Sequence, residues 1–140
     1  MKIGFLTDKN GYRAPIHPES IEKYSLDVHL EKDIFDYLNY SESSQNNVKS
    51  VSKVSDLDIV ACVENIEDKK IKDLKKGAIL IGIFDFEKIE EIKNLRPDIK
   101  ILSFFKLPRI SRAQNLDALS SQANLLGYAS VLRAAKETSD

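Results

Sequence analysis

The chain has 140 residues, of which 42% are hydrophobic and 31% charged, a composition typical of one globular domain and not of a disordered segment. Its 21 Lys and Arg against 22 Asp and Glu give a net charge of -1, which argues against a nucleic-acid-binding protein because such proteins normally carry a basic excess. No apolar run approaches the roughly 20 residues that span a bilayer, no signal peptide is expected, and a single cysteine excludes an intramolecular disulfide, so we expect a cytoplasmic protein.

The first half of the chain predicts strands, a helix and a long connection. Residues 2–6 form a short apolar strand, and Pro18 is well placed to begin a helix that runs to Tyr24. Residues 27–31 alternate apolar and polar side chains, the pattern of a strand. Residues 41–55 are rich in Ser, Asn and Lys, which indicates a solvated connection with a short strand near 48–54.

The second half alternates strands and helices more regularly. The apolar run at 78–84 predicts a central strand that is buried on both faces. The predicted elements are strands at 58–63, 78–84 and 99–107 and helices at 68–75, 86–95 and 117–136. This alternation predicts an α/β fold, a Rossmann-like open, mostly parallel sheet with helices on both faces.

Several common sites are absent from the sequence. The five glycines include no Gly-x-Gly pair, so the fingerprint that holds a dinucleotide pyrophosphate is missing, as is the Gly-Lys-Ser/Thr of nucleotide-binding loops. His17 and His29 are too few for a metal site, and we expect His29 to be an exposed strand residue. Cys62 lies in an apolar run, which favours a buried, unreactive thiol.

Polar side chains with ligand-binding chemistry gather between the last predicted strand and the last helix. Arg109, Arg112, Gln114 and Asp117 would leave the carboxyl end of the strand, where open α/β sheets bind ligands. Arginine forks and a glutamine amide suit a ligand that bears a carboxamide or a phosphate. The alternative is that Asn115 and Asp117 stabilise the helix N-terminus and the arginines are solvated, and the residue types leave both readings open.

The last predicted helix has an unusually small surface. Its small residues include a glycine in mid-helix, Gly127, which costs about 1 kcal/mol relative to alanine. We therefore expect a neighbouring helix or strand to pack closely against it. The small residues are Ser120, Ser121, Ala123, Gly127, Ala129 and Ser130.

A longer motif over this loop and helix is specific to one family. Residues 108–128, PRISRAQNLDALSSQANLLGY, resemble the signature loop and helix of proton-translocating NAD(P) transhydrogenase alpha subunits, and weaker similarity covers Tyr12-Arg13 and residues 58–63. The resemblance implies that residues 1–140 are a single N-terminal domain of the alanine dehydrogenase/transhydrogenase type, without the second domain that grips NAD. It also implies that the cofactor-binding residues are Arg109, Ser111, Arg112, Gln114, Asp117 and Ser120.

The same resemblance implies a function. The loop would cover the nicotinamide of NAD(H), with Gln114 against the nicotinamide while Arg109 and Asp117 order the loop, and Ser120 would lie beside it. Hydride would pass to NADP(H) on a partner domain, coupled to proton translocation through a membrane domain. The chain would supply no catalytic residue, would be inactive alone, and would lie in the cytoplasm, peripheral to the inner membrane, in a homodimer. The alternative is a non-catalytic module that retains the fold and serves subunit assembly or regulation.

Overall fold

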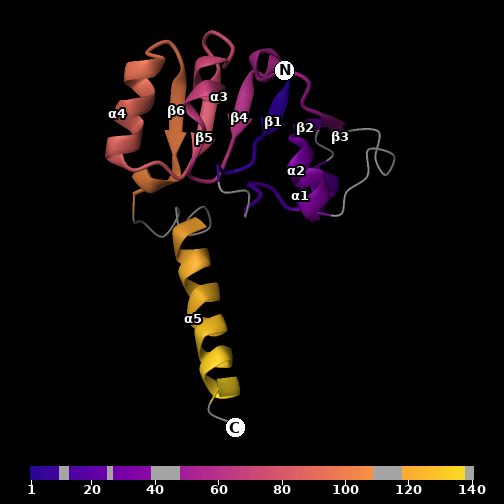
Figure 1. Cartoon of the computed structure of the whole chain (residues 1–140), viewed down its shortest axis with the longest axis vertical. Helices are drawn as coiled ribbons and strands as arrows, with labels where there is room; N and C mark the ends of the chain where they lie inside the picture. Colours follow the sequence, from indigo (N-terminus) through magenta and orange to yellow (C-terminus); the bar gives the residue numbers. More distant parts are fainter. Residues whose placement is uncertain (10–12, 25–26, 39–47, 109–117, 138–140) are drawn as a thin grey trace. The chain divides into compact units, whose positions relative to one another are not determined.

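The computed structural model describes residues 1–9, 13–24, 27–38, 48–108 and 118–137 (Figure 1). They belong to two units, Met1–Ser103 and Phe104–Asp140. None of the helices within these ranges combines the length and the apolar character that are needed to cross a bilayer.

A six-stranded sheet forms the centre of the first unit, and every neighbouring pair of strands is parallel. The strand order is β3-β2-β1-β4-β5-β6 (Figure 1), so the chain builds outward from β1 in one direction and then returns to build in the other. This confirms the predicted α/β, Rossmann-like parallel sheet. The strands are β1 Ile3–Phe5, β2 Val28–Leu30, β3 Val48–Ser50, β4 Ile59–Ala61, β5 Ile79–Gly82 and β6 Lys100–Ser103.

The helices connect the strands as right-handed parallel topology requires. Pro18 begins α1 and Asp85 caps α4, its carboxylate accepting the Lys88 N–H at 2.8 Å, and both helices have the predicted bounds. One helix of seven residues, α2, was not predicted. The helices are α1 Pro18–Tyr24, α2 Lys32–Leu38, α3 Asp68–Lys72, α4 Phe86–Leu95 and α5 Ala118–Glu137, with 3-10 turns η1 Val54–Asp56 and η2 Phe104–Lys106.

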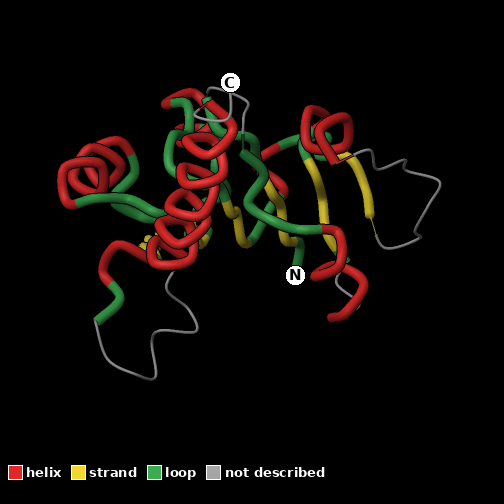
Figure 2. The backbone as a smooth tube through the Cα atoms, turned by 90° about the horizontal axis from the view of Figure 1, so that it is seen from below, coloured by secondary structure: helices red, strands yellow, loops and turns green. Residues whose placement is uncertain are grey.

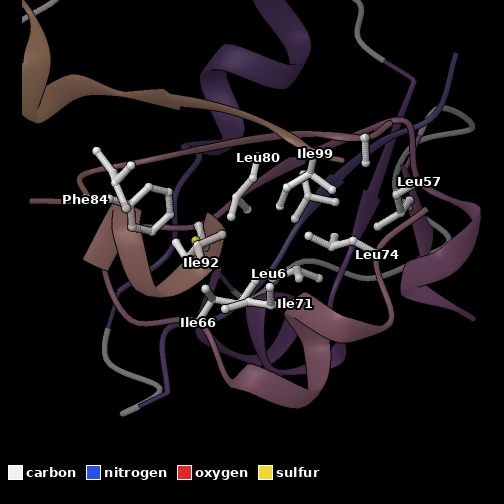
Figure 3. Packing of buried hydrophobic residues seen from close by; sticks show 13 residues of the cluster. Leu6, Leu57, Ile66, Ile71, Leu74, Leu80, Phe84, Ile92 and Ile99 are labelled. Atoms are coloured by element: carbon white, nitrogen blue, oxygen red, sulfur yellow. The ribbon is translucent and has the colours of Figure 1, made fainter. Parts of the chain in front are cut away.

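Two hydrophobic clusters lie on opposite faces of the sheet, and Figure 2 shows helical segments on both sides of the strands. Neighbouring residues of β1 separate the clusters, because Phe5 belongs to one and Leu6 to the other. The larger cluster packs Ile71 of α3 and Ile92 of α4 against the sheet (Figure 3). The smaller cluster does the same with side chains of α1 and α2.

Burial and strand ends differ from the prediction at two places in the first unit. In β5, Leu80 is fully buried, but Ile79 and Ile81 on the opposite face are only partly buried, so the strand is not enclosed on both faces. The last strand ends at Ser103, and the turn η2 replaces the predicted strand residues that follow it.

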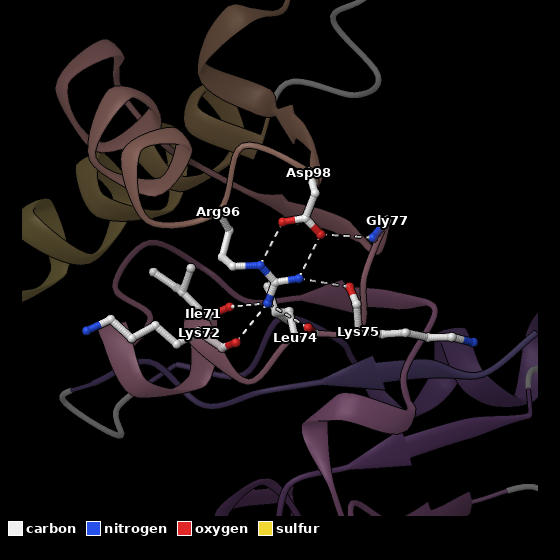
Figure 4. A network of polar contacts seen from close by, with 7 residues as sticks. All are labelled: Ile71, Lys72, Leu74, Lys75, Gly77, Arg96 and Asp98. Carbon is white, nitrogen blue, oxygen red and sulfur yellow. Dashed lines mark hydrogen bonds and ion pairs between the residues drawn. The ribbon is translucent and has the colours of Figure 1, made fainter.

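A polar network fixes the edge of the sheet at which β5 and β6 begin (Figure 4). The Arg96 guanidinium donates to the carbonyl oxygens of Lys72 and Leu74 at 2.8 and 2.7 Å, and so satisfies carbonyl groups at and after the end of α3. Asp98 holds that guanidinium at 2.7 and 2.8 Å and accepts the N–H of Gly77, whose φ of 74° lies in the left-handed region that favours glycine. This network lies at the amino ends of the strands, away from the edge where ligands bind such sheets.

Candidate functional site

The predicted cofactor loop occupies the expected place along the chain. β6 and η2 precede it and α5 follows it, so it joins the carboxyl end of the last strand of the sheet to the long helix. Arg109, Ser111, Arg112, Gln114 and Asp117 lie outside the described residues. The sixth predicted residue, Ser120, lies in the first turn of α5 with an exposed side chain. The binding roles of these residues stay predictions.

Polar side chains converge at another carboxyl edge, between β1 and β4. This is the point where the strand order reverses, the usual position of a ligand crevice in an open α/β sheet. The Asp8 side chain is only 4% exposed there. Its Oδ1 accepts the backbone N–H groups of Glu64 and Asn65 at 3.0 and 2.6 Å, so one carboxylate ties the loop after β1 to the loop after β4.

Arg13 completes this cluster. Its Nη2 donates to Asp8 Oδ2 at 3.0 Å and to Glu64 Oε2 at 2.6 Å. The hydrogen bond to Glu64 is the main cause that raises the pKa of Arg13, so the guanidinium stays charged. Two carboxylates therefore hold Arg13 beside the end of the first strand.

A second cluster lies at the end of β2. Glu31 Oε2 accepts both the backbone N–H and the hydroxyl of Thr7, at 2.7 and 2.6 Å, and Oε1 pairs with Lys70 Nζ at 2.6 Å. In dinucleotide-binding domains, an acidic residue at the end of the second strand binds the ribose hydroxyls. Here both carboxylate oxygens are engaged by the protein itself. Together with the missing Gly-x-Gly, this geometry makes the crevice beside β1 a poor dinucleotide site.

The Glu31 cluster predicts a pH dependence of stability. Burial alone would raise the pKa of Glu31, but the hydrogen bonds from Lys70 and Thr7 outweigh it and lower the pKa below its ordinary value of 4.5. A carboxyl group with a lowered pKa in the folded state contributes stability above its ordinary pKa, and that contribution is lost as the pH falls through the lowered value. We expect Glu31→Gln to reduce the free energy of unfolding at pH 7 and to flatten its decline in acid, as measured by urea unfolding between pH 2 and 7. A decline as steep as that of the unmodified chain would contradict this assignment.

The remaining candidate residues do not form a reactive site. Burial, followed by the nearby Asp8 carboxylate, raises the pKa of the Cys62 thiol to about 12, which confirms the prediction of a buried, unreactive thiol. His29 is half-buried in β2, not exposed as predicted, and His17 lies 3.9 Å from Glu19 on the surface. Within the described ranges, no three His, Cys, Asp or Glu side chains are arranged to hold a metal ion.

Sequence reasoning missed the residues of these two clusters. Asp8 and Glu31 lie one to three residues after strand ends, which is the one signal that could have marked them. Their partners Glu64 and Lys70 are distant in the sequence, and only the strand order brings them together.

Comparison with known proteins gives a consistent family. The chain is 34% identical to an NAD(P) transhydrogenase alpha-subunit protein of Rickettsia prowazekii, over 96% of this chain and 39% of that protein. It is 33% identical to NAD(P) transhydrogenase subunit alpha of Haemophilus influenzae, over 92% of this chain and 27% of that protein. The solved structure of transhydrogenase from Sinorhizobium meliloti superposes with a TM-score of 0.77 and 27% identity, over 98% of this chain and 45% of that chain.

Two further facts bound these likenesses. No protein-family model matches the chain. The chain also spans less than half the length of each of these relatives.

Proposed function

Because this chain is homologous to a portion of the NAD(P) transhydrogenase alpha subunit, we propose that it contributes the nicotinamide-side loop of an NAD(H) site. The observation that carries the proposal is the likeness to alpha subunits over nearly the whole chain, which includes the polar loop between the sheet and α5. Gln114 suits this role because its amide can both donate to and accept from the nicotinamide carboxamide. Arg109 and Asp117 order the loop, while Ser111, Arg112 and Ser120 line the cofactor.

The rest of the cofactor is bound elsewhere. The crevice beside β1 has no Gly-x-Gly, and Thr7 and Lys70 engage its acidic residue, Glu31. The pyrophosphate and adenosine of NAD(H) therefore need a second domain, which this chain does not contain, and NADP(H) lies on a further partner domain. The protein's contribution is to position the nicotinamide, since the hydride chemistry belongs to the two cofactors.

The assembly follows from the same proposal. Hydride transfer between NADH and NADP is coupled to proton translocation through membrane subunits, so this chain lies on the cytoplasmic side, peripheral to the inner membrane. The working unit is a homodimer. The chain alone lacks both the NAD-gripping domain and the NADP domain, and we expect it to be inactive.

A non-catalytic assembly module is the second candidate. It is favoured by α5, whose large apolar side chains are exposed and suit a partner protein. Such a module would keep the fold and bind partner subunits, but it would not need Gln114.

Reconstitution of hydride transfer tests the proposed function. The partner is the alpha-subunit protein of Rickettsia prowazekii from which the segment matching this chain is removed, hereafter the complementing segment, together with the other transhydrogenase subunits of that organism. We expect hydride transfer from NADH to an NADP analogue to rise at least about 10-fold when this chain is added, a modest share of what positioning can supply. The gain should be lost with Gln114→Ala but kept with Lys93→Ala, an exposed residue of α4. Equal rates with and without this chain would refute the enzyme role.

A further inference from the structure

The helix α5 exposes an unusual amount of apolar surface. Its 20 residues contain charged side chains only near the C-terminal end, at Arg133, Lys136 and Glu137. Five large apolar residues are 54–70% exposed. A helix that is apolar around much of its circumference is normally enclosed by other elements. These five residues are Leu125, Leu126, Tyr128, Val131 and Leu132.

Large side chains mark one face of α5. Leu125, Tyr128 and Leu132 follow at intervals of three and four residues, so they lie above one another on the helix, and Val131 flanks them. We call Leu125, Tyr128 and Leu132 the large apolar face. Side chains of this kind typically fill pockets in a partner.

Small residues mark the opposite face. The small-residue stripe consists of five exposed positions, again spaced by three and four residues, and each lies two positions after a member of the large apolar face or in line with such a position. The Ser130 hydroxyl donates to the Leu126 carbonyl of the same helix at 2.7 Å, so it needs no partner outside the helix. The stripe is Ser120, Ala123, Gly127, Ser130 and Ala134.

Gly127 gives the stripe a second, independent meaning. A side chain at Gly4 would collide with Leu57, and one at Gly82 would meet the Phe84 ring at 2.5 Å, so both glycines are required by their own surroundings. A Cβ at Gly127 would meet nothing within 4 Å. A mid-helix glycine costs about 1 kcal/mol relative to alanine, and the described residues give no reason for that cost. The reason therefore lies in a neighbour that these residues do not include.

We propose that α5 is the docking surface for the remaining portion of the transhydrogenase alpha subunit, with the small-residue stripe against a closely approaching helix or strand; this rests on the proposed function. The relatives supply that occupant, because this chain spans 39% of the Rickettsia protein and 45% of the Sinorhizobium chain. The Sinorhizobium match covers 98% of the present 140 residues and so includes α5, in a chain more than twice as long.

The chemistry of the surface fits an apolar protein partner. With all charges of α5 at its C-terminal end, the stripe and the large apolar face offer no complement to a charged ligand. The two faces are opposite each other, so the partner must enclose the helix from more than one side. That requirement suits a polypeptide that folds around α5 better than a single flat contact.

Sedimentation velocity of this chain mixed with the complementing segment, without any nucleotide, tests the proposal. We expect a one-to-one complex, and we expect Gly127→Leu and Leu132→Glu each to weaken it at least about 30-fold, the loss typical of a residue central to an interface. Gly127→Leu should leave or raise the helix content of the chain alone, because leucine is the better helix former. Phe86→Glu, an equally exposed apolar residue of α4, is the matched control and should leave the affinity unchanged.

A second measurement covers the case in which the complementing segment does not fold by itself. In a chimera, this chain replaces the matching segment of the Rickettsia subunit, and hydrogen exchange of the α5 amides is compared with that of the chain alone. We expect exchange slowed at least about 100-fold in the chimera, and restored by Gly127→Leu. Unslowed exchange would overturn the proposal, and so would an α5-dependent association of the chain with itself that the segment does not displace.

Failure of this inference is distinguishable from failure of the proposed function. Docking that is lost with Gly127→Leu, beside NADH binding that ignores Gln114→Ala, would sink the cofactor role alone. NADH binding that needs Gln114 and tolerates Gly127→Leu would sink the docking surface alone.

Discussion

Asp8→Ala is expected to lower the free energy of unfolding by about 3 kcal/mol, a large share of the stability of a domain of this size. The Asp8 carboxylate is nearly buried and accepts the backbone N–H groups of Glu64 and Asn65 as well as Arg13. Alanine would leave two backbone donors without an acceptor and Arg13 with one carboxylate in place of two. The loops after β1 and β4 would lose the group that joins them.

The two Asp8 oxygens allow a matched control. Oδ1 receives both backbone N–H groups, and Oδ2 receives only the arginine. Asp8→Asn keeps an acceptor for the backbone groups and loses only the charged pairing, so we expect a loss of about 1 kcal/mol. Urea unfolding at pH 7 measures both variants. Equal losses would show that the backbone contacts carry no special weight.

Phe84→Ala is expected to cost about 4 kcal/mol, because Phe84 is fully buried and a large cavity would remain in the main cluster (Figure 3). The residue follows β5, and its ring fills the space above Gly82. Thermal and urea unfolding measure the loss. A cost below about 1.5 kcal/mol would mean that the cluster collapses around the missing ring.

Gly82 and Phe84 should also be strongly coupled. A Cβ at Gly82 would lie 2.5 Å from the Phe84 ring and 3.0 Å from the Cys62 carbonyl oxygen. Gly82→Ala should therefore destabilise the chain with Phe84 in place and cost much less in the Phe84→Ala background. Additive losses in the double variant would contradict this packing.

The accuracy of the predicted elements follows local signals. α1 begins at Pro18 and α4 is capped by Asp85, so both helices had marked ends and were predicted with the observed bounds. α2 has seven residues, too few for a helical period to stand out, although Ile34 and Phe35 are buried. β6 ends where Ser103 gives way to a turn, and the apolar residues beyond it gave no local mark of that end.

The polar clusters could not be predicted for a different reason. Asp8 meets Glu64 and Asn65 across 56 and 57 positions of sequence, and Glu31 meets Thr7 across 24. Such contacts depend on which strands are neighbours, and strand order is not visible in hydrophobic periodicity. The cofactor loop came from the motif at residues 108–128 and not from spacing, and the homologues support its family without testing the role of any one side chain.

The central claim, that this chain supplies the nicotinamide side of an NAD(H) site, is tested most directly by titrating NADH into the chain with the complementing segment present. Intrinsic fluorescence of the bound NADH reports binding, and titrations of the chain alone and of the segment alone provide the baselines. We expect tight binding only in the mixture, weakened at least about 10-fold by Gln114→Ala, the size of one lost hydrogen bond to a polar ligand group. Binding that is equally tight without this chain, or unchanged by Gln114→Ala, would contradict the account and favour an assembly module.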